Sequence, residues 1–221
     1  MTNQEFNRDE IRAMRLSYGQ AGIGELNTCP FVAFAEWLRE AHENPIIVEA
    51  NAMVLSTIDS EVSITTRSVL LKDISEGGFT FFTNYSSRKA HSIELNPGVS
   101  LLFPWYAMER QVAISGVAEK ISEQESRDYF ATRPWSSQIG AWASHQSAPL
   151  ASREDLEQRF TGAAEKWPEG SHVPCPPYWG GYRVVPLSIE FWQGRYSRMH
   201  DRVRYERNIA EADWVIGRYY P

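Results

Sequence analysis

The residues best suited to chemistry lie close together near the end of the chain, between Glu190 and Arg202. Within this stretch Arg198, His200 and Arg202 recur at a spacing of two, so an extended backbone would point all three side chains to one side. That arrangement would concentrate positive charge, with one group that titrates near neutrality, where a phosphate or an electron-rich ring could bind. The plainer alternative is a surface strand whose arginines pair with nearby acids such as Glu190 and Asp201.

A second basic cluster falls where an expected strand runs into an expected helix. The residues from Phe82 to Lys89 bring hydroxyl groups, the backbone amides of a helix N-terminus and two adjacent cations, Arg88 and Lys89, into one small volume. This combination is typical of an anion site. Arg67 and Lys72 add cations at the two ends of the preceding strand. The alternative is a capped surface helix with solvated cations.

A third cluster, made of Tyr129, Arg133 and Ser137, repeats at a spacing of four. A helix over 122–132, capped by Ser122 and ended by Pro134, would place the tyrosine and the arginine on one face. The serine follows in the next turn. A common alternative for such a pair is that the tyrosine packs while the guanidinium stacks on it at the surface.

The elements that must position these clusters follow from hydrophobic periodicity. A period of two predicts short strands over 52–58, 63–71, 79–83, 99–103 and 111–119. Short, closely spaced strands favour an antiparallel barrel over a parallel sheet. Amphipathic or capped segments predict helices, the first of them capped by Thr28, over 28–44, 87–95, 122–132, 136–144 and 152–167.

Two further strands are expected near the C-terminus. The first covers 184–192 and ends before Gly194, and its apolar face carries Val185, Leu187, Ile189 and Phe191. The second is a closing strand over 214–220. The basic residues of the first cluster follow the break at Gly194, where the chain turns.

Composition limits the class of protein. The chain has 221 residues, 43% of them apolar and 23% charged, which is typical of one globular domain and not of a disordered chain. A net charge of −6 argues against general nucleic-acid binding. The absence of an 18-residue apolar run and the polar N-terminus argue against a membrane span and a signal peptide, so we expect a cytoplasmic location. His172, Cys175 and the distant Cys29 do not make a metal site.

Taken together, these motifs resemble the pyridoxamine 5'-phosphate oxidase family. Glu190-Phe191-Trp192-Gln193 followed by Arg198-Met199-His200-Asp201-Arg202 resembles its C-terminal signature at every position. Tyr129, Arg133 and Ser137 match its Tyr-x-x-x-Arg-x-x-x-Ser pattern, and the 14–18 run resembles its N-terminal Met-Arg-x-x-Tyr element. The resemblance covers residues 12–221.

The resemblance implies a mainly β fold with flanking helices, the FMN-binding split β-barrel, over 28–221 after a flexible segment over 1–27. It also implies a homodimer with FMN at the interface. The implied reaction, part of vitamin B6 metabolism, oxidises pyridoxine 5'-phosphate or pyridoxamine 5'-phosphate to pyridoxal 5'-phosphate. Dioxygen accepts the electrons, hydrogen peroxide forms, and the amine substrate releases ammonia.

Roles are also implied for individual residues. Arg198 and His200 are the expected catalytic pair. The expected substrate contacts are Arg15, Tyr18, Lys72, Tyr129, Arg133, Ser137, Arg198, Met199 and His200. The expected FMN contacts are Arg67, Ser68, Val69, Leu70, Leu71, Lys72, Phe82, Thr83, Arg88, Lys89, Gln111, Gln146, Ser147, Trp192 and Arg202. Phe82 stands where the family often has tyrosine.

Two other functions remain open. One is a split-barrel flavin oxidase for a different substrate, as in phenazine biosynthesis. The other is a non-catalytic protein that binds FMN or pyridoxal 5'-phosphate, which could dispense with Arg198 and His200. Lys72, Arg133 and Ser137 together favour a phosphorylated substrate, and the presence of Arg198 and His200 favours an enzyme.

Overall fold

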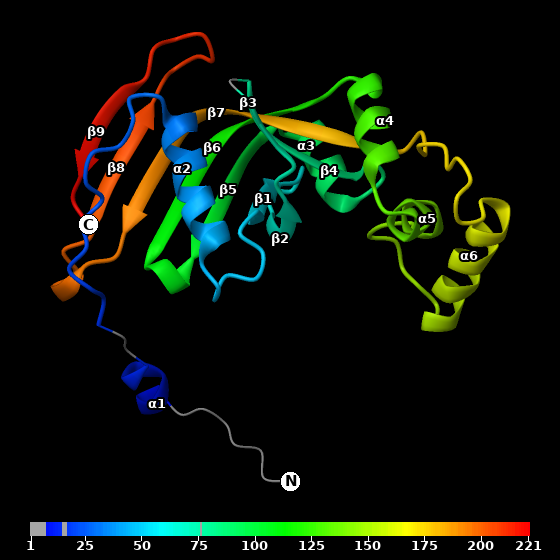
Figure 1. Cartoon of the computed structure of the whole chain (residues 1–221), viewed down its shortest axis with the longest axis horizontal. Coiled ribbons are helices and arrows are strands. Elements are labelled where there is room, and N and C mark those ends of the chain that lie inside the picture. The colour runs from blue at the N-terminus through cyan, green and yellow to red at the C-terminus, as the bar shows by residue number, and fades with distance from the viewer. Residues whose placement is uncertain (1–7, 15–16, 76) are drawn as a thin grey trace.

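The computed structural model describes residues 8–14, 17–75 and 77–221, and within them nine strands form a single sheet (Figure 1). The strands are β1 (Ala52–Ile58), β2 (Ile64–Leu70), β3 (Asp73–Ser75), β4 (Gly78–Asn84), β5 (Gly98–Trp105), β6 (Arg110–Lys120), β7 (Trp179–Gln193), β8 (Asp201–Glu206) and β9 (Val215–Tyr219). The helices are α1 (Arg8–Ala13), α2 (Pro30–Glu43), α3 (Arg88–Leu95), α4 (Glu123–Thr132), α5 (Trp135–Ala143) and α6 (Arg153–Lys166).

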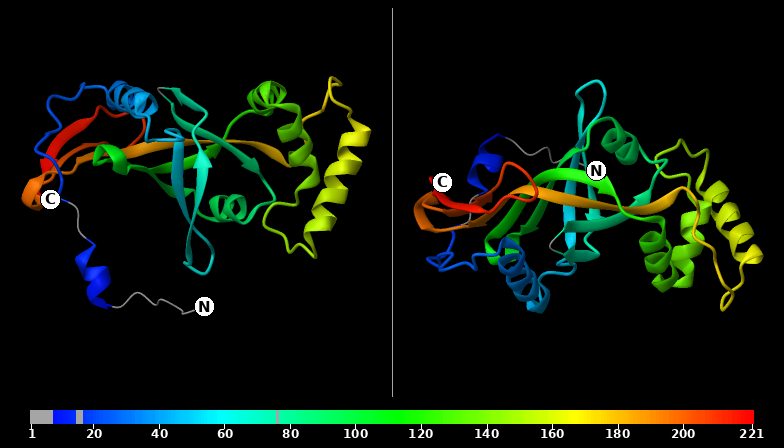
Figure 2. Two further views of the ribbon diagram at one scale, coloured as in Figure 1. Left: turned by 60° about the horizontal axis from the view of Figure 1, so that its bottom comes forward. Right: turned by 90° about the horizontal axis from the view of Figure 1, so that it is seen from above.

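Every pair of neighbouring strands is antiparallel, and the order across the sheet is β2-β1-β5-β6-β7-β4-β3. Strand β7 joins two regions, because its first residues pair with β4 and its last residues pair with β8. Figure 2 shows this strand running from the end that holds α4, α5 and α6 to the end that holds β8 and β9. The predicted mainly β, antiparallel architecture with flanking helices is confirmed.

The main core lies between α2 and the curled sheet. Phe34 is fully buried, with its ring centroid 5.0 Å from that of Phe79 and 4.8 Å from that of Phe103. The helix is present where the sequence predicts it, but the predicted Thr28 cap is wrong. Cys29 occupies the N-cap without a side-chain cap bond, and its N–H donates to the Asn27 side chain at 2.9 Å.

A second, smaller core holds α4, α5 and α6 together at the other end of the sheet. It is built around Phe130, Ile139, Val173 and Trp179. The predicted capping of α4 is confirmed, since Ser122 Oγ accepts the Glu125 N–H at 3.1 Å and the Glu125 carboxylate accepts the Ser122 N–H at 3.0 Å. None of the helices in the described part of the chain has both the length and the apolar character of a membrane span.

Strand β7 departs from the prediction in length and in phase. It begins at Trp179, five residues before the expected start at 184. Val184 is buried, whereas Val185 and Leu187, predicted on the buried face, are only partly buried. Ile189 and Phe191 are buried as predicted.

A β-bulge explains the change of phase. Ser188 pairs with Ser115 and Pro186 pairs with Gly116, so Leu187 is an extra residue without a partner on β6. One inserted residue reverses the side-chain alternation beyond it. Gly116 leaves no room for a side chain at the bulge, since a Cβ there would lie 2.2 Å from the carbonyl oxygen of Val185.

We therefore expect Gly116→Ala to lower the free energy of unfolding by about 1–3 kcal/mol, because backbone atoms must move to admit one methyl group. Urea denaturation measures this change. The control is Gly162→Ala in α6, where the added Cβ would meet no atom within 4 Å beyond its chain neighbours and the nearby backbone of its own helix. Alanine in a helix is favoured over glycine by about 0.5–1 kcal/mol, so the control should be stabilised. Equal effects of the two substitutions would contradict the close approach at the bulge.

Candidate functional site

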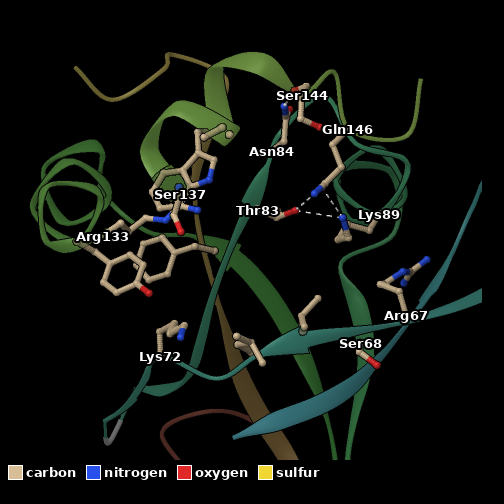
Figure 3. Close-up of a pocket in the computed structure, with 17 residues that line it drawn as sticks. Arg67, Ser68, Lys72, Thr83, Asn84, Lys89, Arg133, Ser137, Ser144 and Gln146 are labelled. Atoms are coloured by element: carbon tan, nitrogen blue, oxygen red, sulfur yellow. Dashed lines mark hydrogen bonds between the residues drawn. The ribbon is translucent and has the colours of Figure 1, made fainter. Parts of the chain in front are cut away.

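One cavity of about 660 Å³ gathers most of the predicted binding residues (Figure 3). It lies between β2, β4 and the helices α4 and α5. The predicted residues that line it are Arg67, Ser68, Val69, Leu70, Lys72, Phe82, Thr83, Lys89, Tyr129, Arg133, Ser137 and Gln146. Four of them are cations, and no carboxylate is among the described residues that line this main cavity.

One end of the main cavity is organised around Lys89, which is 8% exposed. Its ammonium group donates to Gln146 Oε1 at 2.6 Å, to Thr83 Oγ1 at 3.1 Å and to Ser87 Oγ at 3.3 Å. Burial, and then the charge of Arg67, lower the pKa of Lys89 to about 8. All of these acceptors are neutral, so the positive charge at this end is left for an anionic ligand.

The opposite end is organised around Arg133 (Figure 3). Its guanidinium carbon lies 4.9 Å from the centroid of the Trp179 ring and 5.5 Å from that of Phe130. Burial lowers the pKa of Arg133, although a guanidinium stays charged. Nη1 is buried and has no hydrogen-bond partner among the described residues. A buried, charged donor without an acceptor fits a ligand oxygen.

Six predicted FMN contacts do not line the main cavity, and three of these, Leu71, Arg88 and Ser147, are direct sequence neighbours of residues that do. Leu71 is 4% exposed and belongs to the core of the sheet. Arg88 is exposed, and its Nη2 lies 3.4 Å from a carboxylate oxygen of Asp59. Arg88 and Ser147 line a smaller cavity of about 410 Å³ that shares two cations with the main cavity. This smaller cavity could admit an anion beside Lys89.

The remaining predicted residues lie at the other end of β7, next to β8: Tyr18, Gln111, Trp192, Arg198, Met199, His200 and Arg202. Tyr18, Trp192 and His200 form a ring cluster, with centroids 5.8 Å apart for Tyr18 and Trp192 and 4.7 Å apart for Trp192 and His200. Arg15 lies outside the described residues.

The predicted extended arrangement of Arg198, His200 and Arg202 is wrong. Tyr196–Arg198 is a short 3-10 turn closed by the Met199 N–H to Tyr196 carbonyl bond, and strand β8 begins only at Asp201. Ser197 and Arg198 have φ values of 56° and 61°. Left-handed conformations are costly for such residues and concentrate at functional sites.

The charges in this region divide between paired and unpaired groups. Arg202 Nη2 lies 2.8 Å from Glu190 Oε2, so the plainer expectation of local ion pairs describes this residue. Arg198 is exposed and forms no ion pair with another described residue. His200 Nδ1 accepts the backbone N–H of Arg195 at 3.0 Å. A backbone N–H can only donate, so the neutral ring carries its proton on Nε2.

The two groups of predicted residues are not brought together within one chain. Trp179 in the main cavity and Trp192 in the ring cluster lie near opposite ends of the 15-residue strand β7. At about 3.3 Å per residue the ends of such a strand are roughly 40 Å apart along it, too far for a side chain to bridge. A ligand in the main cavity can therefore meet Arg198 and His200 only from a second copy of the chain.

The main cavity also contains residues that the sequence did not predict for the site: Asn84, Gly140, Ala141, Ser144 and Trp179. Asn84 Nδ2 donates to the Ser144 carbonyl at 3.4 Å, which ties β4 to the end of α5. Trp179 is the first residue of β7, five residues before the expected start of this strand. The Gly180-Gly181 pair that follows it is a usable signal, because glycine within a strand often marks a place where another group approaches the backbone closely.

Known proteins with a similar sequence belong to the family that the sequence motifs resemble. The Pyridoxamine 5'-phosphate oxidase family model matches residues 38–166, and the Pyridoxine 5'-phosphate oxidase C-terminal dimerisation region model matches residues 179–221. The chain belongs to the pyridoxamine 5'-phosphate oxidase family.

Individual relatives are similar over nearly the whole chain. A pyridoxine/pyridoxamine 5'-phosphate oxidase of Streptomyces avermitilis is 44% identical, covering 97% of this chain and 99% of the relative. One of Burkholderia cenocepacia is 47% identical, covering 94% and 97%.

Solved structures show the same fold. PhzG from Burkholderia lata, in complex with tetrahydrophenazine-1-carboxylic acid, is 30% identical with a TM-score of 0.83, covering 90% of this chain and 96% of that one. A pyridoxamine 5'-phosphate oxidase-related, FMN-binding protein of Nostoc punctiforme is 15% identical with a TM-score of 0.70, covering 89% and 100%. The expected split-barrel fold is confirmed.

The depressed pKa of Lys89 predicts a pH-dependent affinity for a phosphate-bearing ligand such as FMN. The amine is charged below about pH 8 and neutral above it, and only the charged form pairs with phosphate. Losing one charge-assisted hydrogen bond should weaken binding roughly tenfold or more between about pH 7 and about pH 10.

Quenching of FMN fluorescence measures this affinity. Lys89→Arg is the control, because a guanidinium stays charged throughout this range and should remove most of the pH dependence. A wild-type affinity that does not change across the range would contradict a direct contact between Lys89 and the phosphate of the ligand.

Proposed function

We propose that this protein catalyses the FMN-dependent oxidation of pyridoxamine 5'-phosphate and pyridoxine 5'-phosphate to pyridoxal 5'-phosphate. Dioxygen is the electron acceptor, hydrogen peroxide is formed, and the amine substrate releases ammonia. The observation that carries the proposal is the main cavity with cations at both ends and no carboxylate among its described lining residues. Two separated cationic ends suit two phosphate groups, one on the cofactor and one on the substrate. Two relatives named pyridoxine/pyridoxamine 5'-phosphate oxidase, at 44% and 47% identity, support the proposal.

The Lys89 end fits the phosphate of FMN. Lys89 and Arg67 supply charge, Thr83 and Gln146 supply polar groups, and Arg88 adds a cation from the smaller cavity. When FMN is bound, it supplies the redox chemistry, as a hydride acceptor and a route for electrons to dioxygen. The protein contributes binding and orientation.

The Arg133 end fits the phosphate of the substrate. Arg133, Lys72, Tyr129 and Ser137 line this end of the main cavity. The unpartnered Nη1 of Arg133 gains an acceptor when a phosphate oxygen binds. Binding the phosphate at a fixed place orients the rest of the substrate. Part of the binding energy is thereby used to hold the reacting atoms in the geometry that the reaction needs.

The active assembly is proposed to be a homodimer. The match of residues 179–221 to a region described as a dimerisation region supports it. The distance between the two groups of predicted residues supports it too, because Arg198 and His200 of a second copy would complete the main cavity of the first.

Arg198 and His200 have distinct proposed roles over the substrate. Arg198 is a cation without an ion pair among the described residues, so it is free to orient the substrate and to stabilise developing negative charge. His200 presents Nε2–H, so it donates a hydrogen bond to a substrate oxygen or nitrogen. While Nδ1 accepts from Arg195, Nε2 of the neutral ring is the donor in this role.

A second candidate is a split-barrel oxidase for an unphosphorylated ring compound. The similarity to PhzG, at a TM-score of 0.83, favours it. The unpartnered cation Arg133 and the nearby Lys72 favour a phosphorylated substrate instead. Comparing turnover of phosphorylated and unphosphorylated substrates separates the two functions, and any turnover excludes a non-catalytic binding protein.

The proposed function is tested anaerobically. The protein is loaded with FMN, pyridoxine 5'-phosphate is added, and the flavin absorbance is followed. We expect the flavin to bleach and then to regain its colour in air as pyridoxal 5'-phosphate appears. FMN that binds but stays oxidised with both the alcohol and the amine phosphates would point to another substrate, and failure to bind FMN would overturn the proposal.

Two arginine substitutions should separate chemistry from cofactor binding. Arg198→Ala should lower kcat by about 100-fold or more, because the substitution removes the cation that stabilises negative charge at the reacting atoms. FMN should stay bound, because Arg198 is not among the residues proposed to hold the FMN phosphate. Arg88→Ala should instead weaken FMN retention. Single-turnover flavin reduction and the flavin content of purified protein measure the two effects. Unchanged turnover in the first variant, or normal flavin content in the second, would refute the corresponding role.

A further inference from the structure

We propose that Trp179 is a positioning residue for substrate recognition: its ring holds the Arg133 guanidinium in the orientation that binds the substrate phosphate monoester. The inference rests on the proposed function and deepens it. It gives a role to a side chain that none of the sequence motifs above contains.

Trp179 and Phe130 form a corner around the guanidinium. Trp179 is the first residue of β7 and is 8% exposed, and its ring meets that of Phe130 edge to face at a centroid distance of 5.0 Å. The guanidinium carbon of Arg133 lies 4.9 Å from the first ring and 5.5 Å from the second. Two buried rings thus restrict a side chain that would otherwise sample many rotamers.

An aromatic ring holds the guanidinium without using a lone-pair acceptor. The attraction comes from the ring quadrupole, so the N–H groups stay available to phosphate oxygens. Nη1 is buried without a partner, and the Arg133 side chain forms no hydrogen bond with another described residue. A carboxylate in the place of the ring would occupy these donors and cancel the charge. The tryptophan therefore fixes the group and keeps it ready to bind.

The same ring aligns a second substrate contact. The rings of Trp179 and Phe82 are tilted by only 10° with centroids 5.2 Å apart, and those of Phe82 and Tyr129 by 20° at 4.0 Å. Gly181 permits this packing, because a Cβ there would lie 3.0 Å from Phe82 Cε1. The stack connects Tyr129 to the same support that holds Arg133.

A purely structural role is the rival explanation, since Trp179 also belongs to the small core with Ile139 and Val173. A structural role predicts that replacement lowers stability, FMN retention and turnover together. A positioning role predicts a selective loss of affinity for the phosphate of the substrate. Another possible occupant of the Arg133 end is the phosphate of FMN, and in that case FMN retention would fall in place of substrate affinity.

The test compares Trp179→Leu, which removes the ring, with Trp179→Phe, which keeps a smaller one. For FMN-loaded protein, the leucine substitution should raise KM for pyridoxine 5'-phosphate, and Kd for pyridoxal 5'-phosphate by calorimetry, about tenfold, the size expected for one desolvated cation–π contact. The phenylalanine substitution should restore most of this loss. In both variants kcat and FMN retention should stay near wild type.

Trp142→Phe is the matched control. Trp142 packs against Trp167 in the same helical region, with centroids 4.7 Å apart, and is not among the described residues that line the main cavity. The Trp142→Phe substitution should leave KM for pyridoxine 5'-phosphate unchanged. If Trp179→Leu does not fold, Trp179→Met replaces it, because an unbranched side chain can fill the space without a ring.

A double-mutant cycle with Arg133→Ala shows whether Trp179 acts through Arg133. We expect Trp179→Leu to add little to Kd once the guanidinium is gone. Additive effects, an unchanged Kd in Trp179→Leu, or a loss of FMN retention in place of substrate affinity would each overturn the inference. A wild-type protein that binds pyridoxal 5'-phosphate but oxidises neither substrate would refute the proposed function alone, because the calorimetric comparison still decides the role of Trp179. A wild-type protein that binds no phosphate ester would overturn both.

Discussion

Uncompensated positive charge inside one cavity is the constraint on which the rest of the site depends. Four cations line the main cavity without a carboxylate among its described lining residues, in a chain with a net charge of −6. Holding such charges together is unfavourable unless the fold fixes them and a ligand neutralises them. The fold fixes them with neutral acceptors around Lys89 and with aromatic rings around Arg133. Both devices restrict the cation while leaving its charge available.

Much of the fold follows from local sequence signals. The helix capped by Ser122 and the alternating strands are local, because the cap and the period of two are properties of neighbouring residues. The side-chain alternation along β7 is not a local property, because the bulge at Leu187 depends on how β7 pairs with Gly116 of the distant strand β6. The turn at Arg198 likewise depends on contacts with distant parts of the chain, including the Tyr196 N–H to Gly19 carbonyl bond at 2.9 Å.

For the candidate site, the sequence predicts the charged and polar binding residues but not the residues that support them. Charged and polar residues in motifs such as Tyr129, Arg133 and Ser137 are visible in the sequence, and they meet at one cavity. The aromatic residues that hold them in place are harder to predict. A sequence does not show whether a residue such as Trp179 packs only in a core or also contacts a binding residue. The separation of Arg198 and His200 from this cavity could not be predicted either, since it follows from the length of β7.

That separation has a genetic consequence under the proposed dimer. Each site would draw the phosphate-binding residues from one chain and Arg198 and His200 from the other. A chain defective at Arg133 and a chain defective at Arg198 would each be inactive alone. Mixed in one dimer, they would form one site with both defects and one site with neither. Two loss-of-function alleles of this kind would therefore complement each other, whereas two alleles affecting the same end of β7 would not.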